Sequence, residues 1–241
     1  MKFREIKISH VKAVIILILI LGNIYYNTHY AKIDSRTFKT DVKEIHFVDL
    51  DNNKNIRQLN KCREIEELFI TGTNEKSFSK LRNFHNLSDL IIGHCEISSS
   101  DCEKISQFDN LRELDTCSDT VIDFKGFNSD IVSCIRFLES KVINFKSLSE
   151  CKSLKSITIG FATVCDNCIV VEDNKYVMKD SSVFASFDYV EELRIFVDKI
   201  EDISGIIEMD SLKVLEVDKG TLSEDDKRLL EDKGISVIEN E

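Results

Sequence analysis

The sequence predicts an α/β repeat solenoid built from short parallel strands, and two observations carry that prediction. An apolar phrase of the form h-x-x-L-x-x-L-x-L occurs seven times. Its second anchor returns every 21 to 24 residues, apart from one interval of 36 residues between Leu154 and Val190. A fixed period of this length is typical of stacked units that bury their apolar edges only against their neighbours. The single long interval predicts an insertion, over residues 161–183.

Each unit is predicted to contain one strand and one compact return. The L-x-L end of the phrase predicts the strand, because alternate side chains of a strand point to opposite faces. Two upstream positions three residues apart suit a 3₁₀ or short helical return. In the successive units those upstream positions are Ile56/Leu59, Phe78/Leu81, Cys102/Ile105, Asp123/Gly126, Phe145/Leu148, Ser181/Phe184 and Ile203/Ile206. A fainter first copy at Val42, Ile45 and Phe47 predicts one more strand, with Ile45 and Phe47 facing the core.

The repeated phrase resembles the leucine-rich repeat, specifically the short internalin-like class of about 22 residues. The resemblance covers residues 40–240. It implies a horseshoe with parallel strands on the concave face, 3₁₀, irregular or short helical returns behind them, and a protein-binding role. The asparagine that the family places three residues after each strand is replaced in every copy, by Thr73, Cys95, Asp119, Ser140, Ala162, Asp198 and Gly220.

The N-terminus is a separate segment in which basic residues precede an apolar run. Lys2, Arg4, Lys7 and Lys12 come before a stretch from Ala13 to Leu21 that contains no polar residue. This order predicts a cytoplasmic N-terminus and an extracytoplasmic remainder. No small-x-small cleavage pair follows, so we expect an uncleaved signal anchor that forms a transmembrane helix and tethers the protein to a membrane. Secretion after signal cleavage is the alternative.

The chain therefore divides into five predicted segments. They are a cytoplasmic basic segment at 1–10, the signal anchor at 11–30, a linker and N-terminal cap at 31–50, the repeats at 51–220, and a C-terminal cap at 221–241. In the last segment, Ser223 and Asp226 resemble a helix capping box, Gly234 suits the end of that helix, and Ile235–Ile238 suits a final strand.

Charge excludes one class of partner. Beyond residue 32 there are 27 basic and 42 acidic residues, a formal charge of −15. A nucleic-acid partner is not expected, because phosphate binding requires a basic face. The acidic surface favours a basic partner or metal cations, or it serves only solubility, and the last reading is the stronger.

One cysteine pair stands outside the repeats, at Cys165 and Cys168 within the insertion. The apolar runs that follow, at 169–171 and 176–178, predict a β-hairpin. A C-x-x-C pair suits a disulfide, thiol exchange or half of a zinc site. The chain has no second such pair and the insertion has no histidine. We expect a local structural disulfide, with free thiols and metal or redox chemistry as alternatives.

The other cysteines follow the repeat. Cys62, Cys102 and Cys151 occupy core positions and are expected to be buried and inert. Cys117 and Cys134 lie on the outer face of adjacent strands, but four residues out of register. That offset corresponds to roughly 13 Å along the strand, too far for a disulfide.

No catalytic constellation is found, so we expect a protein that is not an enzyme and uses no cofactor. The eight glycines form no phosphate-binding loop, and the five histidines show no metal-ligand spacing, so no metal site is expected.

Function is therefore predicted to lie on the exposed positions of the concave strand face, as a binding site for a protein partner. Phe69 and Ile91 share a register on neighbouring strands and should form a small apolar patch. Arg136 and Arg194 could pair with partner carboxylates, although ion pairs with their own acidic neighbours are the stronger expectation. The candidate binding residues are Glu67, Phe69, Asp89, Ile91, Glu113, Asp115, Arg136, Leu138, Arg194 and Phe196. A purely structural surface protein is a further alternative.

Overall fold

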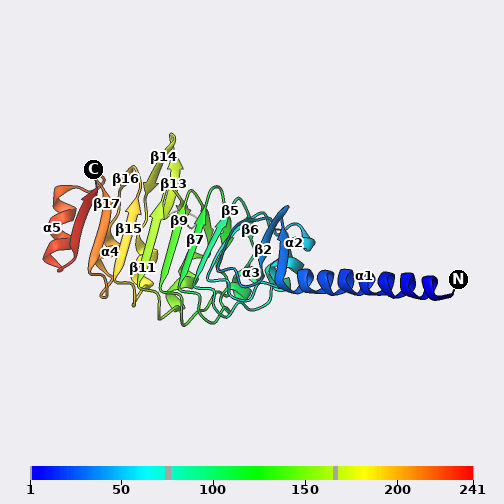
Figure 1. Ribbon diagram of the computed structural model, residues 1–241. Helices are drawn as coiled ribbons and strands as arrows, with labels where there is room; N and C mark the ends of the chain where they lie inside the picture. The colour runs from blue at the N-terminus through cyan, green and yellow to red at the C-terminus, as the bar shows by residue number, and fades with distance from the viewer. Residues whose placement is uncertain (1, 74–76, 165–167, 241) are drawn as a thin grey trace.

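The computed structural model describes residues 2–73, 77–164 and 168–240, with side chains from Ile15 onward. Its main feature is a nine-stranded sheet in which all the neighbouring strands are parallel (Figure 1). The strands are β3 (Glu44–Val48), β4 (Glu67–Thr71), β5 (Asp89–Gly93), β7 (Glu113–Cys117), β9 (Cys134–Leu138), β11 (Ser156–Gly160), β15 (Glu192–Phe196), β17 (Val214–Asp218) and β18 (Ser236–Asn240). The predicted repeat solenoid with parallel strands is confirmed.

In β4, β7, β9, β15 and β17, burial alternates as the repeated phrase requires, whereas in β11 the outward Thr158 and Gly160 are buried as well. In β4, Leu68 and Ile70 are fully buried, whereas Glu67, Phe69 and Thr71 are half-buried on the opposite face. The buried positions of successive strands form one continuous core. We call the outward-facing side chains of the nine-stranded sheet the strand face.

The first strand departs from the prediction. Phe47 was expected in the core, but it is 58% exposed, and Val48 is buried in its place. The pairing of β3 with β4 shifts register between Ile45 and Val48, and Phe47 has a left-handed φ of 58°. One extra residue in a strand is a β-bulge, which turns two consecutive side chains to the same face. His46 and Phe47 therefore both lie on the strand face.

The returns are short and differ between repeats, as predicted. They are α2 (Asn53–Leu59), η1 (Phe78–Lys80), α3 (Ser99–Ile105), η2 (Phe145–Glu150), η3 (Ser182–Ser186) and α4 (Ser204–Ile207). The return between β7 and β9 contains no helix, and there the predicted core positions are wrong. Phe124 and Phe127 are buried instead of Asp123 and Gly126, and their rings meet edge to face at 5.3 Å.

A second sheet, which the repeat pattern did not predict, runs along the edge where the chain leaves the main strands. It has the order β16-β14-β13-β12-β10-β8-β6. Five of its strands are brief: β6 (Glu96–Ile97), β8 (Val121–Asp123), β10 (Lys141–Ile143), β12 (Thr163–Val164) and β16 (Lys199–Ile200). The insertion supplies the other two, β13 (Ile169–Glu172) and β14 (Lys175–Met178), as the predicted antiparallel hairpin. Its turn residues, Asp173 and Asn174, both have positive φ, as tight hairpin turns require.

The stacking of α4 on η3 is unusually close. A Cβ on Gly205 would lie 1.9 Å from the carbonyl oxygen of Ser181, so only glycine fits. The Ser181 hydroxyl accepts a hydrogen bond from the Gly205 amide and donates one to Asp202. Burial by itself would raise the pKa of Asp202, but hydrogen bonds from Ser181 and Ser204 outweigh it and lower that pKa to about 2. Asp202 therefore stays ionised and ties the two repeats together.

The two ends of the solenoid are closed differently. At the N-terminal end, β1 (Tyr30–Ile33) and β2 (Arg36–Lys39) form an antiparallel hairpin whose Ala31 and Ile33 are buried. At the C-terminal end, α5 (Glu224–Asp232) precedes β18. Ser223 caps this helix, as predicted, since its hydroxyl accepts a hydrogen bond from the Asp226 amide and donates one to the Asp226 carboxylate.

The first helix, α1 (Lys2–His29), extends away from the repeats (Figure 1). Within the described part of the chain, no helix is both long enough and apolar enough to cross a membrane. The predicted transmembrane helix over 11–30 is therefore not supported. Residues 11–14 of that segment belong to the stretch whose side chains lie outside the description.

Aromatic rings connect the middle repeats through the core. Phe145 is fully buried, and its ring centroid lies 6.0 Å from that of Phe137, 5.7 Å from that of Phe184 and 5.1 Å from that of Phe187. These rings come from four different elements or turns, so a single side chain joins successive units.

We predict that Phe145→Ala lowers the free energy of unfolding by about 3–5 kcal/mol, because it removes buried apolar area and leaves a cavity. Urea unfolding followed by circular dichroism measures this. The control is Leu229→Ala in α5, where Leu229 is 54% exposed and the change should stay within about 0.5 kcal/mol. A loss below about 1 kcal/mol for Phe145→Ala would show that the core closes around the missing ring.

Candidate functional site on the strand face

The strand face begins with a row of acids. Glu44, Glu67, Asp89 and Glu113 occupy the same register position on four successive strands. Neighbouring strands lie about 4.8 Å apart, so these carboxylates are side by side and repel one another. The same position on the next strand is Cys134, which ends the row. This half of the strand face therefore attracts cations.

Beside the acidic row lies an apolar patch, which we define as Phe47, Phe69 and Ile91. Phe69 and Ile91 are register partners on β4 and β5, as predicted. The bulge adds Phe47, whose ring centroid lies 4.5 Å from that of Phe69. Gly93 leaves room for the Phe69 ring, because a Cβ there would come within 3.2 Å of Phe69 Cε2. We call this group the N-terminal patch.

Two arginine networks occupy the middle and far part of the strand face. Arg136 donates through Nε to Asp115 at 2.9 Å and through Nη2 to Glu113. Arg194 donates to Glu216 at 2.7 Å and to Glu192 at 3.0 Å. Both guanidinium groups are thus paired with acids of this chain, as the sequence favoured. Their role is to neutralise the strand face and to fix side-chain positions on it.

Burial raises the pKa of Asp115, and the attraction of Arg136 lowers it only in part. This direction is opposite to the usual one, since an acid with a nearby base usually has a lowered pKa. At neutral pH, the positive charge of Arg136 therefore offsets the cost of burying the Asp115 carboxylate beside Glu113.

A second apolar group, the C-terminal patch, consists of Leu138, Phe161 and Phe196. Leu138 and Phe196 are the register partners of Gly160 on either side. A Cβ on Gly160 would lie 2.9 Å from Leu138 Cδ2 and 3.7 Å from Phe196 Cδ2, so both side chains lean over the glycine. Phe161 follows with a left-handed φ of 50° and is 47% exposed. Such a conformation is strained for a bulky side chain.

The insertion reaches this second patch. Tyr176 of β14 meets Phe161 edge to face, with ring centroids 5.8 Å apart. The hairpin thus supports one border of the strand face.

The cysteines mostly behave as core residues. Cys62, Cys102 and Cys151 are buried, as predicted. Burial raises the pKa of the Cys62 thiol to about 11, which removes its reactivity at neutral pH. Cys117 and Cys134 have the predicted offset, because their register partners are Gly93 and Glu113 of adjacent strands.

The predicted disulfide between Cys165 and Cys168 falls partly outside the description. Cys165 lies in the stretch 165–167, which is not described. Cys168 is buried, at 4% exposure.

One cluster was missed by the sequence analysis. Glu44, His46 and Glu67 each offer a ligand atom, and these atoms lie within 4.8 Å of one another. His46 Nε2 is 3.1 Å from Glu67 Oε1. Spacing along the chain hid the cluster, because Glu67 is one repeat away from the other two. The usable signal was Glu-x-His on a strand followed by a glutamate at the same repeat position.

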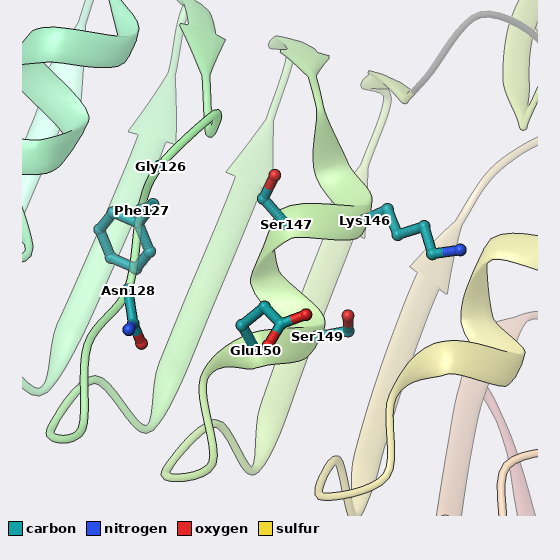
Figure 2. A pocket seen from close by; sticks show the side chains of 7 residues that line it. All are labelled: Gly126, Phe127, Asn128, Lys146, Ser147, Ser149 and Glu150. Atoms are coloured by element: carbon teal, nitrogen blue, oxygen red, sulfur yellow. The ribbon is translucent and has the colours of Figure 1, made fainter.

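A hollow on the return side is a further surface feature. It has a volume of about 460 Å³ and is lined by Gly126, Phe127, Asn128, Lys146, Ser147, Ser149 and Glu150 (Figure 2). It lies between the helix-free return and η2. In Figure 2, Lys146 extends away from the other labelled side chains. This hollow brings no converging set of ligands together.

No protein-family model matches this chain, and no curated protein matches it. Among solved structures it is similar to internalin C2 of Listeria monocytogenes, with 15% identity, a TM-score of 0.47, and coverage of 84% of this chain and 78% of that one. It is also similar to internalin F of the same organism, with 14% identity, a TM-score of 0.45, and coverage of 85% of this chain and 63% of that one. Similarity of this degree carries no information about partners.

We predict that Arg136→Ala lowers stability at pH 7 by about 1–3 kcal/mol, between the values for exposed and buried ion pairs. Without Arg136, the pKa of Asp115 rises further above its unfolded value. Protonation then favours the folded state, so the deficit should shrink as the pH falls from 7 to about 4. Urea unfolding at several pH values measures this.

The matched control is Arg112→Ala, because Arg112 is exposed and makes no ion pair among the described residues. It should change stability by less than about 0.5 kcal/mol at every pH. A deficit for Arg136→Ala that grows on acidification would contradict the assigned role of Asp115.

Proposed function

We propose that this chain is a binding protein, not an enzyme, and that it recognises a protein partner through the strand face, which the repeat resemblance identifies with the concave face. The observation that carries the proposal is the N-terminal patch, in which the exposed Phe47 contacts the half-buried Phe69, the register partner of Ile91. Phe47 is 58% exposed and is held outward by a left-handed backbone. Strained, exposed aromatic residues are characteristic of recognition surfaces.

The proposal also defines the partner's chemistry. The patch is bordered by the carboxylates of Glu67 and Asp89, whereas the arginines of the strand face are already paired. A partner with an apolar side chain flanked by lysine or arginine would complement this surface. Assignment to the short internalin-like class of leucine-rich repeats is part of the same proposal.

Among the candidate residues, we assign Phe69, Ile91, Glu67 and Asp89 to direct contact. Glu113, Asp115, Arg136 and Arg194 are assigned to holding the surface in shape, since they pair with one another or with their neighbours. Leu138 and Phe196 are assigned to a second contact region. The alternatives centred on Cys165 and Cys168 gain no support from the described residues, because Cys165 is not among them.

The test is crosslinking of the full chain in cells that produce it, with Phe69→Glu combined with Ile91→Lys. We expect a crosslinked partner with the parent chain and a loss of at least about tenfold with the double variant, since two central contacts are replaced by charges. Circular dichroism confirms that both chains are folded.

The matched control introduces the same two charges elsewhere, as Tyr189→Glu with Ile131→Lys. Both residues are exposed and precede main strands. The control should retain the partner. If the parent and the Phe69→Glu, Ile91→Lys variant recover equal amounts of the partner, the contact does not lie on the N-terminal patch.

We further propose an extracytoplasmic location, with the N-terminal segment as the export signal. Its support is the order of basic and apolar residues and the exposure of the apolar side chains on α1, from Ile15 at 50% to Leu19 at 67%. Such a surface is unfavourable in water. A phosphatase fused after Glu241, active only outside the cytoplasm, should be active with the full chain and inactive without residues 2–30. Equal activity in both fusions would refute the export signal.

A further inference from the structure

We propose that Glu44, His46 and Glu67 form a binding site for a divalent transition-metal ion of the zinc type. The three side chains lie at the N-terminal end of the strand face, and their ligand atoms lie within 4.8 Å of one another. This inference does not rest on the protein partner proposed above, although Glu67 belongs to both surfaces.

The backbone brings these side chains together for two reasons. Glu44 and His46 are two residues apart on β3 and so point to the same face. Glu67 is the register partner of Glu44 on β4. Parallel pairing therefore brings both carboxylates close to the imidazole, and all three side chains come from strands.

The bulge fixes the imidazole. Arg36 Nη2 donates to the carbonyl oxygens of His46 and Phe47 at 2.7 and 2.9 Å. These bonds hold the backbone in the conformation that turns both side chains outward. The His46 ring also meets the Phe47 ring edge to face at 6.4 Å. A ligand held by its backbone and by a neighbouring ring loses little freedom when an ion binds.

Electrostatics favour a cation at this point. Glu44 and Glu67 are like charges in direct register, and Asp89 continues the row. The nearest lysine in the sequence, Lys43, is paired with Glu66 at 2.6 Å. An ion between Glu44 and Glu67 would remove their mutual repulsion.

The ligand types select the class of ion. Calcium and magnesium prefer an all-oxygen shell, whereas imidazole with carboxylates suits zinc and other first-row divalent ions. Ligands to one zinc ion lie about 3–4 Å apart, so the observed separations need only small side-chain rotations. Three protein ligands leave at least one position open, and the site is half exposed, so water completes the shell.

The site lies beside the N-terminal patch, since Phe47 follows His46 and Phe69 lies two residues beyond Glu67. An ion here would present its open position on the same surface as the Phe47 and Phe69 rings. A donor group brought by another molecule could then take the place of the bound water.

The test is zinc titration of the metal-free full chain, kept reduced, by isothermal calorimetry. We expect one zinc ion per chain with a dissociation constant in the micromolar range. His46→Gln and Glu67→Gln should each weaken binding at least about tenfold, because each removes a direct ligand. Zinc should also raise the melting temperature of the parent but not of His46→Gln.

The matched control is His85→Gln. His85 is also exposed and paired with a carboxylate, since its Nδ1 lies 2.7 Å from Asp109 Oδ2, but the described residues place no third ligand there. This variant should bind zinc as the parent does. Because the chain has eight cysteines, cobalt is titrated in parallel, and nitrogen and oxygen ligation predicts a spectrum without the intense thiolate-to-cobalt absorption.

Two results would overturn the proposal. One is the absence of saturable zinc binding up to about 100 µM, which is too weak for a three-ligand site. The other is binding that does not use this cluster, seen either as equal affinity in the parent and His46→Gln, which would exclude His46 as a ligand, or as a thiolate spectrum with cobalt, which would assign the ion to cysteines.

Discussion

The parallel register of the nine-stranded sheet is the constraint on which the rest of this molecule depends. Each unit pairs with its neighbours through the same backbone hydrogen bonds, so every outward position becomes part of a row that crosses the strands. Row membership decides the environment of a side chain more than its sequence neighbours do. The four-carboxylate row, the Phe69–Ile91 contact and the Arg136 network all arise between residues that are about one repeat apart.

The distribution of charge on the strand face follows from those rows. The two arginines of the strand face, Arg136 and Arg194, each have an acid in the same row on a neighbouring strand and form an ion pair with it. The outward positions of the first four strands hold carboxylates but no arginine. Among these carboxylates, Glu113 and Asp115 on β7 are paired with Arg136 of the next strand. The surface is thus neutralised in one half and left acidic in the other. Apolar side chains lie in both halves, but only those near β3 have unneutralised acids beside them.

The repeat period was sufficient to predict the main strands and most core and outward positions, because burial in a solenoid follows the register directly, whereas the hairpin in the insertion was predicted from its two apolar runs. It failed where one residue was added or shifted. The bulge at Phe47 and the displaced pair Phe124 and Phe127 each preserve burial of two apolar side chains while breaking the spacing. The second sheet escaped prediction because its strands are only two to four residues long. The Glu44–His46–Glu67 cluster escaped because its ligands meet across strands.

The insertion changes one border of the molecule and leaves the other unchanged. Its two extra strands enter the second sheet between β12 and β16, yet β11 and β15 remain directly paired in the main sheet. The second sheet therefore contains two strands that have no counterpart in the main sheet, and the insertion leaves the spacing of strands on the strand face unchanged. An insertion of a different length would change only the second sheet, and the spacing between Leu138, Gly160 and Phe196 would stay constant.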